Sequence, residues 1–186
     1  MKSARLPASE TQASRREKNS DAGVVHFITL TTKDHEPWLA TSRTRDVFLA
    51  VLRAWHSERH GRILAATVLP DHAHVLVRLG ESVKTVQVIN GWKSAIRRGA
   101  GYAETFQDKF SDHPLKEDED PEDYALYMFL HPYRGKHCKA DQAWVGWWSP
   151  EPGFFQFMGS LNSKGGPPQE WIDWPASKFA KLGHGE

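Results

Sequence analysis

Several features are scarce in this 186-residue sequence, and each scarcity excludes a class of protein. The single cysteine, Cys138, excludes an internal disulfide and a metal site built from several thiolates. Long apolar runs are missing, which excludes a membrane-spanning helix, and the first residues lack the apolar centre of a secretory signal. No repeat with a period of about 20 to 50 residues is present, which excludes solenoids and propellers. We therefore expect a cytoplasmic protein with no membrane partner.

The net charge of +1 conceals two segments of opposite charge. Residues 82–103 contain four bases and no acid, whereas residues 117–123 contain six acids and no base. A polyanion responds to local charge rather than to net charge. The four bases are therefore candidate contacts for a polyanion, with an ordinary solvated helix face as the alternative: Lys84, Lys93, Arg97 and Arg98.

The chain divides into three segments by composition. Residues 1–22 are polar and charged and predict a flexible N-terminal arm. Residues 23–138 carry the apolar periodicities of strands and helices and predict one globular domain. Residues 139–186 form an extension rich in Trp, Gly and Pro, which we expect to wrap over the core as ordered loops. Stacking of its aromatic rings on unpaired bases is the alternative role.

Apolar periodicity predicts the order strand, helix, strand, strand, helix, strand, helix. The expected strands are residues 24–32, 62–69, 72–79 and, more weakly patterned, 106–112; the expected helices are 43–59, 83–98 and 121–131. The last helix has Asp120 as its N-cap and Pro121 at its first position, and we expect Pro132 to end it near His131. This order is typical of an α+β fold, a ferredoxin-like antiparallel sheet with helices packed on it.

His72 and His74 lie two residues apart within a strand-forming segment. Side chains of a strand alternate between its faces, so both imidazoles project from the same face. Imidazole is the commonest protein ligand of ions such as Zn and Mn, so the pair is a candidate metal site. Two polar side chains at a sheet edge are the alternative.

The predicted helix 121–131 has two different sides. Leu126, Phe129 and Leu130 fall on one side, and the opposite side carries Tyr124, Tyr127 and His131. If this helix lies across the sheet at the His pair, His131 completes a three-imidazole site beside the phenol of Tyr127. The alternatives are an amphipathic aromatic for Tyr127 and a helix-terminal cation for His131.

Two segments resemble the signatures of the HUH single-strand DNA endonucleases. Pro70-Asp71-His72-Ala73-His74-Val75-Leu76-Val77 resembles their His-hydrophobe-His strand, and Tyr127-Met128-Phe129-Leu130-His131-Pro132 resembles their tyrosine helix. Within that family, the sequence is most similar to the REP-associated tyrosine transposases, from about Val24 to Gly135. The resemblance implies the HUH endonuclease fold and makes residues 23–138 the single-tyrosine transposase domain.

The resemblance also implies a reaction and a set of partners. His72, His74 and His131 would bind a divalent metal ion, Mn or Mg, and Tyr127 would attack a phosphate of single-stranded or hairpin DNA. The products would be a 5′-phosphotyrosine and a free 3′-hydroxyl, which can rejoin. A phenol with a pKa of about 10 needs a nearby cation or base to act as a nucleophile at pH 7. The DNA contacts would be Lys84, Lys93, Arg97 and Arg98, and the protein would be a monomer or a homodimer.

The sequence departs from the family pattern in three places. The third ligand is often an amide residue, whereas His131 makes an all-nitrogen site that favours Mn over Mg. The acidic run 117–123 precedes the tyrosine and is expected to face away from DNA or to be bridged to it by cations. The extension matches the family faintly, at Trp174-Pro175-Ala176-Ser177-Lys178-Phe179. His26 and Thr29 of the first strand are expected beside the site.

Two other functions fit the same residues. The chain would be a domesticated DNA-binding protein if it keeps the fold without cleaving DNA. It would be a hydrolytic metalloenzyme on another substrate if Tyr127 is dispensable.

Overall fold

The computed structural model describes residues 23–57, 61–80, 83–101 and 106–182. The predicted N-terminal arm and the last residues of the predicted helix 43–59 lie outside these ranges. Five strands form one antiparallel sheet in the order β4-β1-β3-β2-β5. The strands are β1 (Val24–Thr31), β2 (Gly61–Val68), β3 (His72–Leu79), β4 (Ser111–Pro114) and β5 (Trp147–Trp148).

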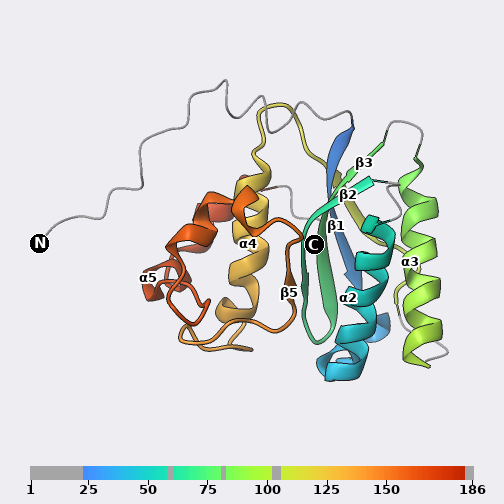
Figure 1. Cartoon of the computed structure of the whole chain (residues 1–186), viewed down its shortest axis with the longest axis horizontal. Coiled ribbons are helices and arrows are strands. Elements are labelled where there is room, and N and C mark those ends of the chain that lie inside the picture. The colour runs from blue at the N-terminus through green and yellow to red at the C-terminus, as the bar shows by residue number, and fades with distance from the viewer. Residues whose placement is uncertain (1–22, 58–60, 81–82, 102–105, 183–186) are drawn as a thin grey trace, which may run out of the picture.

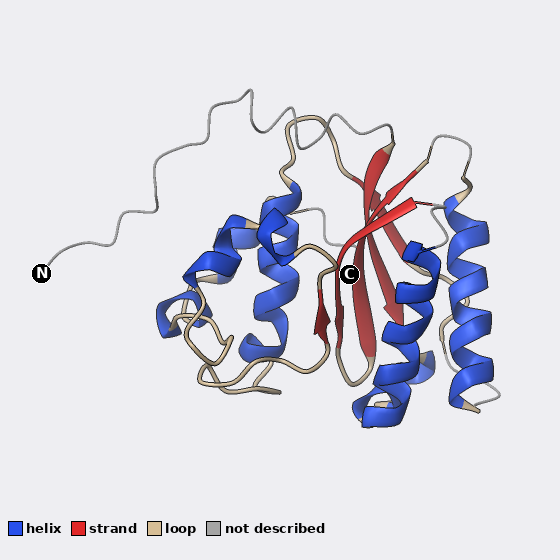
Figure 2. Ribbon diagram, viewed as in Figure 1, coloured by secondary structure: helices blue, strands red, loops and turns tan. Residues whose placement is uncertain are grey.

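Helices cover both faces of this sheet (Figures 1 and 2). On one face lie α2 (Ser42–Ser57) and α3 (Thr85–Ala100), and on the other lies α4 (Pro121–Arg134), itself covered by the C-terminal extension. The predicted α+β architecture is therefore confirmed. The short elements are η1 (Lys33–His35), η2 (Trp38–Ala40), η3 (Pro152–Phe154), η4 (Gln156–Ser160), α5 (Gln169–Ile172) and η5 (Ala176–Phe179). Among the described residues, no helix is long and apolar enough to span a membrane.

Alternation along β1 and β3 creates two separate cores. Ile28 and Val75 are fully buried on the α2 and α3 face, with the aliphatic residues of those helices. Phe27 and Leu76 point to the opposite face and pack with residues of α4 and of the extension. The same opposite face carries His72 and His74, because they occupy positions of β3 that alternate with Val75.

The predicted fourth strand is wrong in position. Residues 111–114 pair with β1, whereas residues 106–110 form no strand and Phe106 makes a single bridge with Thr32. Phe106 and Phe110 instead pack as partly buried side chains against the α2 and α3 core. The alternation read from the sequence therefore reflects two anchoring phenylalanines rather than a pleated strand.

The predicted end of α4 is also wrong. Pro132 lies inside the helix, which continues to Arg134. A proline ring removes one backbone hydrogen bond, but Pro132 is buried in a closely packed region, and tertiary packing outweighs this local cost. The N-terminal signal is confirmed, because the Asp120 carboxylate accepts a hydrogen bond from the backbone N–H of Glu122 at 3.0 Å.

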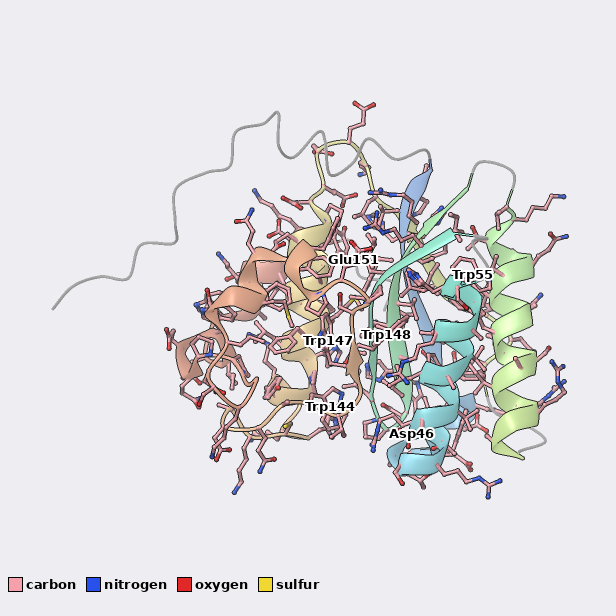
Figure 3. All side chains as sticks on the ribbon, in the orientation of Figure 1. Asp46, Trp55, Trp144, Trp147, Trp148 and Glu151 are labelled. Carbon is pink, nitrogen blue, oxygen red and sulfur yellow. The ribbon has the colours of Figure 1, made fainter. Side chains whose placement is uncertain are left out.

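The C-terminal extension is more than a set of loops, because β5 joins the edge of the sheet through pairs with Ala66 and Thr67 of β2. Trp147 points toward α4 and contacts Phe129 at a centroid distance of 5.2 Å, whereas Trp148 lies toward α2 (Figure 3). The two tryptophans therefore pack on opposite faces of the sheet, and the expectation that aromatic residues of the extension pack on the core is confirmed for them.

Candidate metal and tyrosine site

Three histidines from two elements meet on the α4 face of the sheet. His72 and His74 come from β3 and His131 from α4, and their candidate ligand nitrogens all lie within 4.8 Å of one another. Nε2 of His74 lies 3.2 Å from Nδ1 of His131. Nitrogens bound to one ion at about 2.1 Å lie about 3.0 to 3.4 Å apart, so this pair already has the spacing of two ligands.

Hydrogen bonds orient the two imidazoles of β3. Nδ1 of His72 lies 2.7 Å from Oδ1 of Asp71, and Nδ1 of His74 lies 2.9 Å from Oγ1 of Thr29. Each bond engages the nitrogen nearer the backbone, and Nε2 of His74 meets Nδ1 of His131 on the other side of the ring. Outer partners of this kind fix the tautomer and ring orientation of metal-binding histidines.

Asp71 is itself held in place at the end of β1. Its backbone carbonyl accepts hydrogen bonds from both the N–H and the hydroxyl of Thr32, each at 2.8 Å. Partial burial raises the pKa of the Asp71 carboxyl, but the hydrogen bond and charge of His72 outweigh this effect and hold the pKa below its usual range. The carboxylate is thus ionised at neutral pH and is a suitable acceptor for an imidazole N–H.

Tyr127 lies one helical turn before His131, and its ring completes the group. The ring centroid of Tyr127 lies 5.5 Å from that of His131 and 5.9 Å from that of His74. The side chain is half-buried between Phe27 and Phe179, whose centroids lie 6.2 Å and 5.6 Å away. A phenol and three imidazoles therefore form one partly exposed cluster.

The two sides predicted for α4 are both buried. The side with Tyr124, Tyr127 and His131 faces the sheet, and Tyr124 is fully buried with its hydroxyl donating to Glu119 at 2.6 Å. Phe129, on the other side, packs against the extension rather than against the sheet core. The helix therefore lies between two layers, the sheet on one side and the C-terminal extension on the other.

Three of the six acidic residues in 117–123 make contacts that stabilise the fold. Glu119 accepts hydrogen bonds from the hydroxyl of Tyr124 and from the N–H of Lys116, and it pairs with His113 at 2.9 Å. Asp120 caps α4, and the Glu122 carboxylate accepts from the N–H groups of Gln156 and Phe157 at 3.0 Å and 2.8 Å. The exposed members are Glu117, Asp118 and Asp123.

The predicted DNA contacts lie away from the histidines, on and beside α3 across the sheet (Figure 1). Lys93 donates hydrogen bonds to the carbonyl oxygens of Gln107 and Asp108 at 2.5 Å and 3.1 Å. Burial lowers the pKa of its ammonium group, although the charge of Asp108 raises it. Lys84, Arg97 and Arg98 are exposed. Their contact with DNA stays a prediction.

The two further candidates on β1 have different outcomes. Thr29 lies at the site through its bond to His74, whereas His26 points to the opposite face and pairs with Asp112 at 2.8 Å. Alternation along β1 separates them, because their positions differ by three and side chains an odd number of positions apart point to opposite faces. The same alternation identifies Phe27, which shares the face of Thr29 and which the sequence reasoning did not select.

Comparison with known families agrees with the resemblance stated above. Residues 21–110 match the family model described as Transposase IS200 like, a range that includes His72 and His74 and ends before Tyr127 and His131. No curated protein sequence matches the chain.

The solved structures similar to the protein include two transposases. A REP-associated tyrosine transposase bound to a REP hairpin superposes with a TM-score of 0.57 at 21% identity, over 83% of this chain and 87% of that one. A putative transposase from Deinococcus radiodurans R1 gives a TM-score of 0.46 at 15% identity, over 52% of this chain and 82% of that one. The fold is that of the REP-associated tyrosine transposase, so the fold that the sequence resemblance implies is confirmed.

Proposed function

We propose that the protein is a metal-dependent single-strand DNA endonuclease and transposase that cleaves and rejoins hairpin or repeat DNA through a 5′-phosphotyrosine. The observation that carries the proposal is the cluster of Tyr127, His72, His74 and His131, which is assembled from a strand and a helix that are far apart in the sequence. The match of residues 21–110 to IS200-like transposases supports the reaction class.

Each residue has a defined part in the proposed reaction. The Tyr127 phenol gives up its proton to solvent as its oxygen attacks the scissile phosphorus, and the bond from that phosphorus to the 3′ oxygen of the preceding nucleotide breaks. The 3′ oxygen takes up a proton and becomes a free hydroxyl, while the phosphate stays on Tyr127. Attack by a 3′-hydroxyl reverses these steps and rejoins a strand, so one phosphodiester is exchanged for another.

His72, His74 and His131 would hold the divalent ion, because their candidate ligand nitrogens lie within 4.8 Å of one another and two of the rings are oriented from behind by Asp71 and Thr29. When bound, a divalent cation neutralises charge on the phosphate and favours the deprotonated phenol beside it. An all-imidazole donor set suits Mn better than Mg, which prefers oxygen ligands.

Single-stranded or hairpin DNA is the proposed partner. The structurally similar transposase is described as bound to a REP hairpin, and an unpaired strand bends freely enough to bring one phosphate to the partly buried Tyr127. The exposed Lys84, Arg97 and Arg98 would contact phosphates distant from the cleavage point. Lys93 would contribute chiefly through the loop that it holds.

The test is covalent capture of DNA. The full-length protein is incubated with Mn²⁺ and a library of hairpin oligonucleotides carrying single-stranded flanks, and the products are resolved on denaturing gels. We expect a protein–DNA adduct with wild type and none with Tyr127→Phe, while both bind the hairpin equally. Hairpin binding without any wild-type adduct would favour the domesticated binding protein. An adduct that survives Tyr127→Phe would refute the assignment of the nucleophile.

A further inference from the structure

Phe27 of β1 has a ring that contacts both the tyrosine and one histidine of the site. It stacks on His74 at a centroid distance of 5.2 Å and an interplanar angle of 21°, and it meets Tyr127 edge-on at 6.2 Å and 76°. Only 2% of Phe27 is exposed. The ring therefore lies beneath the site rather than at its entrance, and it cannot take part in substrate binding from solvent.

A third contact ties Phe27 to the helix. Tyr124, about one turn before Tyr127 on α4, packs against Phe27 at 5.2 Å, and the Tyr124 hydroxyl is fixed by the carboxylate of Glu119. Two aromatic side chains of α4 thus rest on one ring of β1. Because the interior of a protein is close-packed, the thickness of this ring fixes the distance between α4 and the sheet at the site.

Two residues of the neighbouring strand β1 hold His74. Thr29 bonds its Nδ1, which fixes the rotation of the ring, and Phe27 stacks on its face, which fixes the plane. A flat aromatic ring can hold the plane of an imidazole, whereas a branched aliphatic chain of similar volume cannot. The hydrogen bond from Thr29 and the stacking contact with Phe27 therefore restrain different degrees of freedom of the His74 side chain.

We infer that Phe27 is a positioning residue that sets the Tyr127 phenol and the His74 imidazole at their working separation. The inference rests on the proposed function, because it concerns the geometry of that reaction. Reactions between positioned groups are sensitive to small displacements, and a shift of about 1 Å can cost about 100-fold in rate. A purely structural role would instead affect the folded fraction alone.

A matched pair of substitutions separates these roles. Phe129 is, like Phe27, 2% exposed in the same core, but it lies two residues after Tyr127 on α4, and its ring meets Tyr133, Trp147 and Phe157. Two residues along a helix correspond to about 200° of rotation, so Phe129 points away from the histidines. Phe129→Leu removes the same atoms as Phe27→Leu without changing a ring that touches the site.

The experiment measures three quantities on folded full-length protein, with folding verified by circular dichroism. They are hairpin affinity, the rate of adduct formation at saturating hairpin and Mn²⁺, and the visible absorption of Co²⁺ titrated into the three-histidine site. For Phe27→Leu we expect unchanged hairpin affinity, an adduct rate lower by about 10- to 100-fold, and weaker or altered Co²⁺ bands. For Phe129→Leu we expect wild-type values in all three. If Phe27→Leu does not fold, Phe27→Met takes its place.

Equal effects of the Phe27 and Phe129 substitutions on adduct rate and Co²⁺ absorption would overturn the inference, since the ring would then be ordinary core material. A wild-type protein that forms no adduct and gives no Co²⁺ bands would refute the proposed function itself. The two failures are therefore distinguishable.

Discussion

The two faces of the sheet are built from alternate residues of the same strands and differ in almost every other respect. The face under α2 and α3 is a mainly aliphatic core in which Ile28, Leu30 and Val75 are fully buried. The opposite face interrupts its apolar surface with Thr29, His72 and His74. Imidazoles occupy places that apolar side chains would fill, so this face needs apolar material from elsewhere.

The C-terminal extension supplies that material in aromatic form. Phe155, Phe157, Trp171 and Phe179 from the extension belong to the core on the α4 side. Large flat rings pack beside imidazoles and a phenol without demanding hydrogen bonds. One strand pair therefore supports a face of tightly packed aliphatic side chains and a face that carries the proposed site, which we call the reactive face. Substitutions on the two faces should have separable consequences.

The largest expected effect concerns the aliphatic face. Phe48 of α2 is fully buried, and Phe48→Ala leaves a cavity that should lower the free energy of unfolding by about 3 to 5 kcal/mol. Urea denaturation measures this loss. In protein that remains folded, adduct formation should be unchanged. Loss of adduct formation by a fully folded Phe48→Ala protein would show that the two faces are not independent.

Two threonines provide a comparison within the reactive face. Thr29 and Thr67 are the cross-strand partners of His74 on its two sides, in β1 and β2. Thr29 bonds the imidazole, whereas the buried hydroxyl of Thr67 has no hydrogen-bond partner among the described residues. Thr29→Val should weaken Mn²⁺ or Co²⁺ binding by about 10- to 100-fold.

Thr67→Val is the control for this comparison. It should leave metal affinity unchanged and raise the free energy of unfolding by about 1 kcal/mol, because an unsatisfied hydroxyl is removed from the interior. Calorimetric titration and urea denaturation give both quantities. The same loss of metal affinity in the two variants would refute a specific role of the Thr29 hydroxyl.

The attachment of the extension to the reactive face depends on Glu122. Its carboxylate accepts hydrogen bonds from two backbone N–H groups at the start of η4. Glu122→Ala should therefore lower the free energy of unfolding by about 1 to 2 kcal/mol and speed amide hydrogen exchange at residues 156 and 157. Glu117→Ala, in the exposed part of the acidic run, is the matched control. Unchanged exchange in Glu122→Ala would show that the aromatic contacts alone hold the extension.

The smallest expected effect is on the pH dependence of stability. Burial raises the pKa of Glu119, but bonds from the Lys116 N–H, Tyr124 and His113 outweigh it, so the pKa lies below its ordinary value of 4.5. A carboxyl whose pKa is lowered by folding stabilises the protein above its unfolded pKa, and this contribution disappears as pH falls through the folded pKa.

Glu119→Gln should therefore have a lower free energy of unfolding than wild type at pH 7, and the difference between the two proteins should narrow below about pH 4.5. Urea denaturation of both proteins at pH 7 and below pH 4.5 measures this difference. A difference that stays constant with pH would mean that the hydrogen bonds, and not the charge, carry the contribution.

Long periodic elements were predictable from the sequence, and short edge elements were not. The apolar repeats of α2, α3, β2 and β3 extend over enough residues to define their periods, and they fall within a few residues of the predicted bounds. The four residues of β4 and the two of β5 carry no periodicity. They exist because neighbouring strands offer unpaired edges, which is a tertiary cause.

The site likewise has residues that the sequence predicts and contact partners that it does not. The strand period and the helical spacing placed His72 beside His74 and Tyr127 near His131, and the resemblance brought the two pairs together. The partners of these residues depend on register between strands, which pairs Thr29 with His74, and on packing of helix against sheet, which places Phe27 under Tyr127. Neither can be read from one segment alone.

The two outer strands of the sheet have a consequence for behaviour at high concentration. Open strand edges are templates on which other chains add strands and aggregate, and natural proteins restrict them. Here β4 exposes a ladder of four residues and β5 one of two, and β5 also shields the full-length edge of β2 near Ala66 and Thr67. Removal of residues 147–148 would uncover that edge, so we expect the shortened protein to aggregate sooner in concentrated solution than the full-length chain.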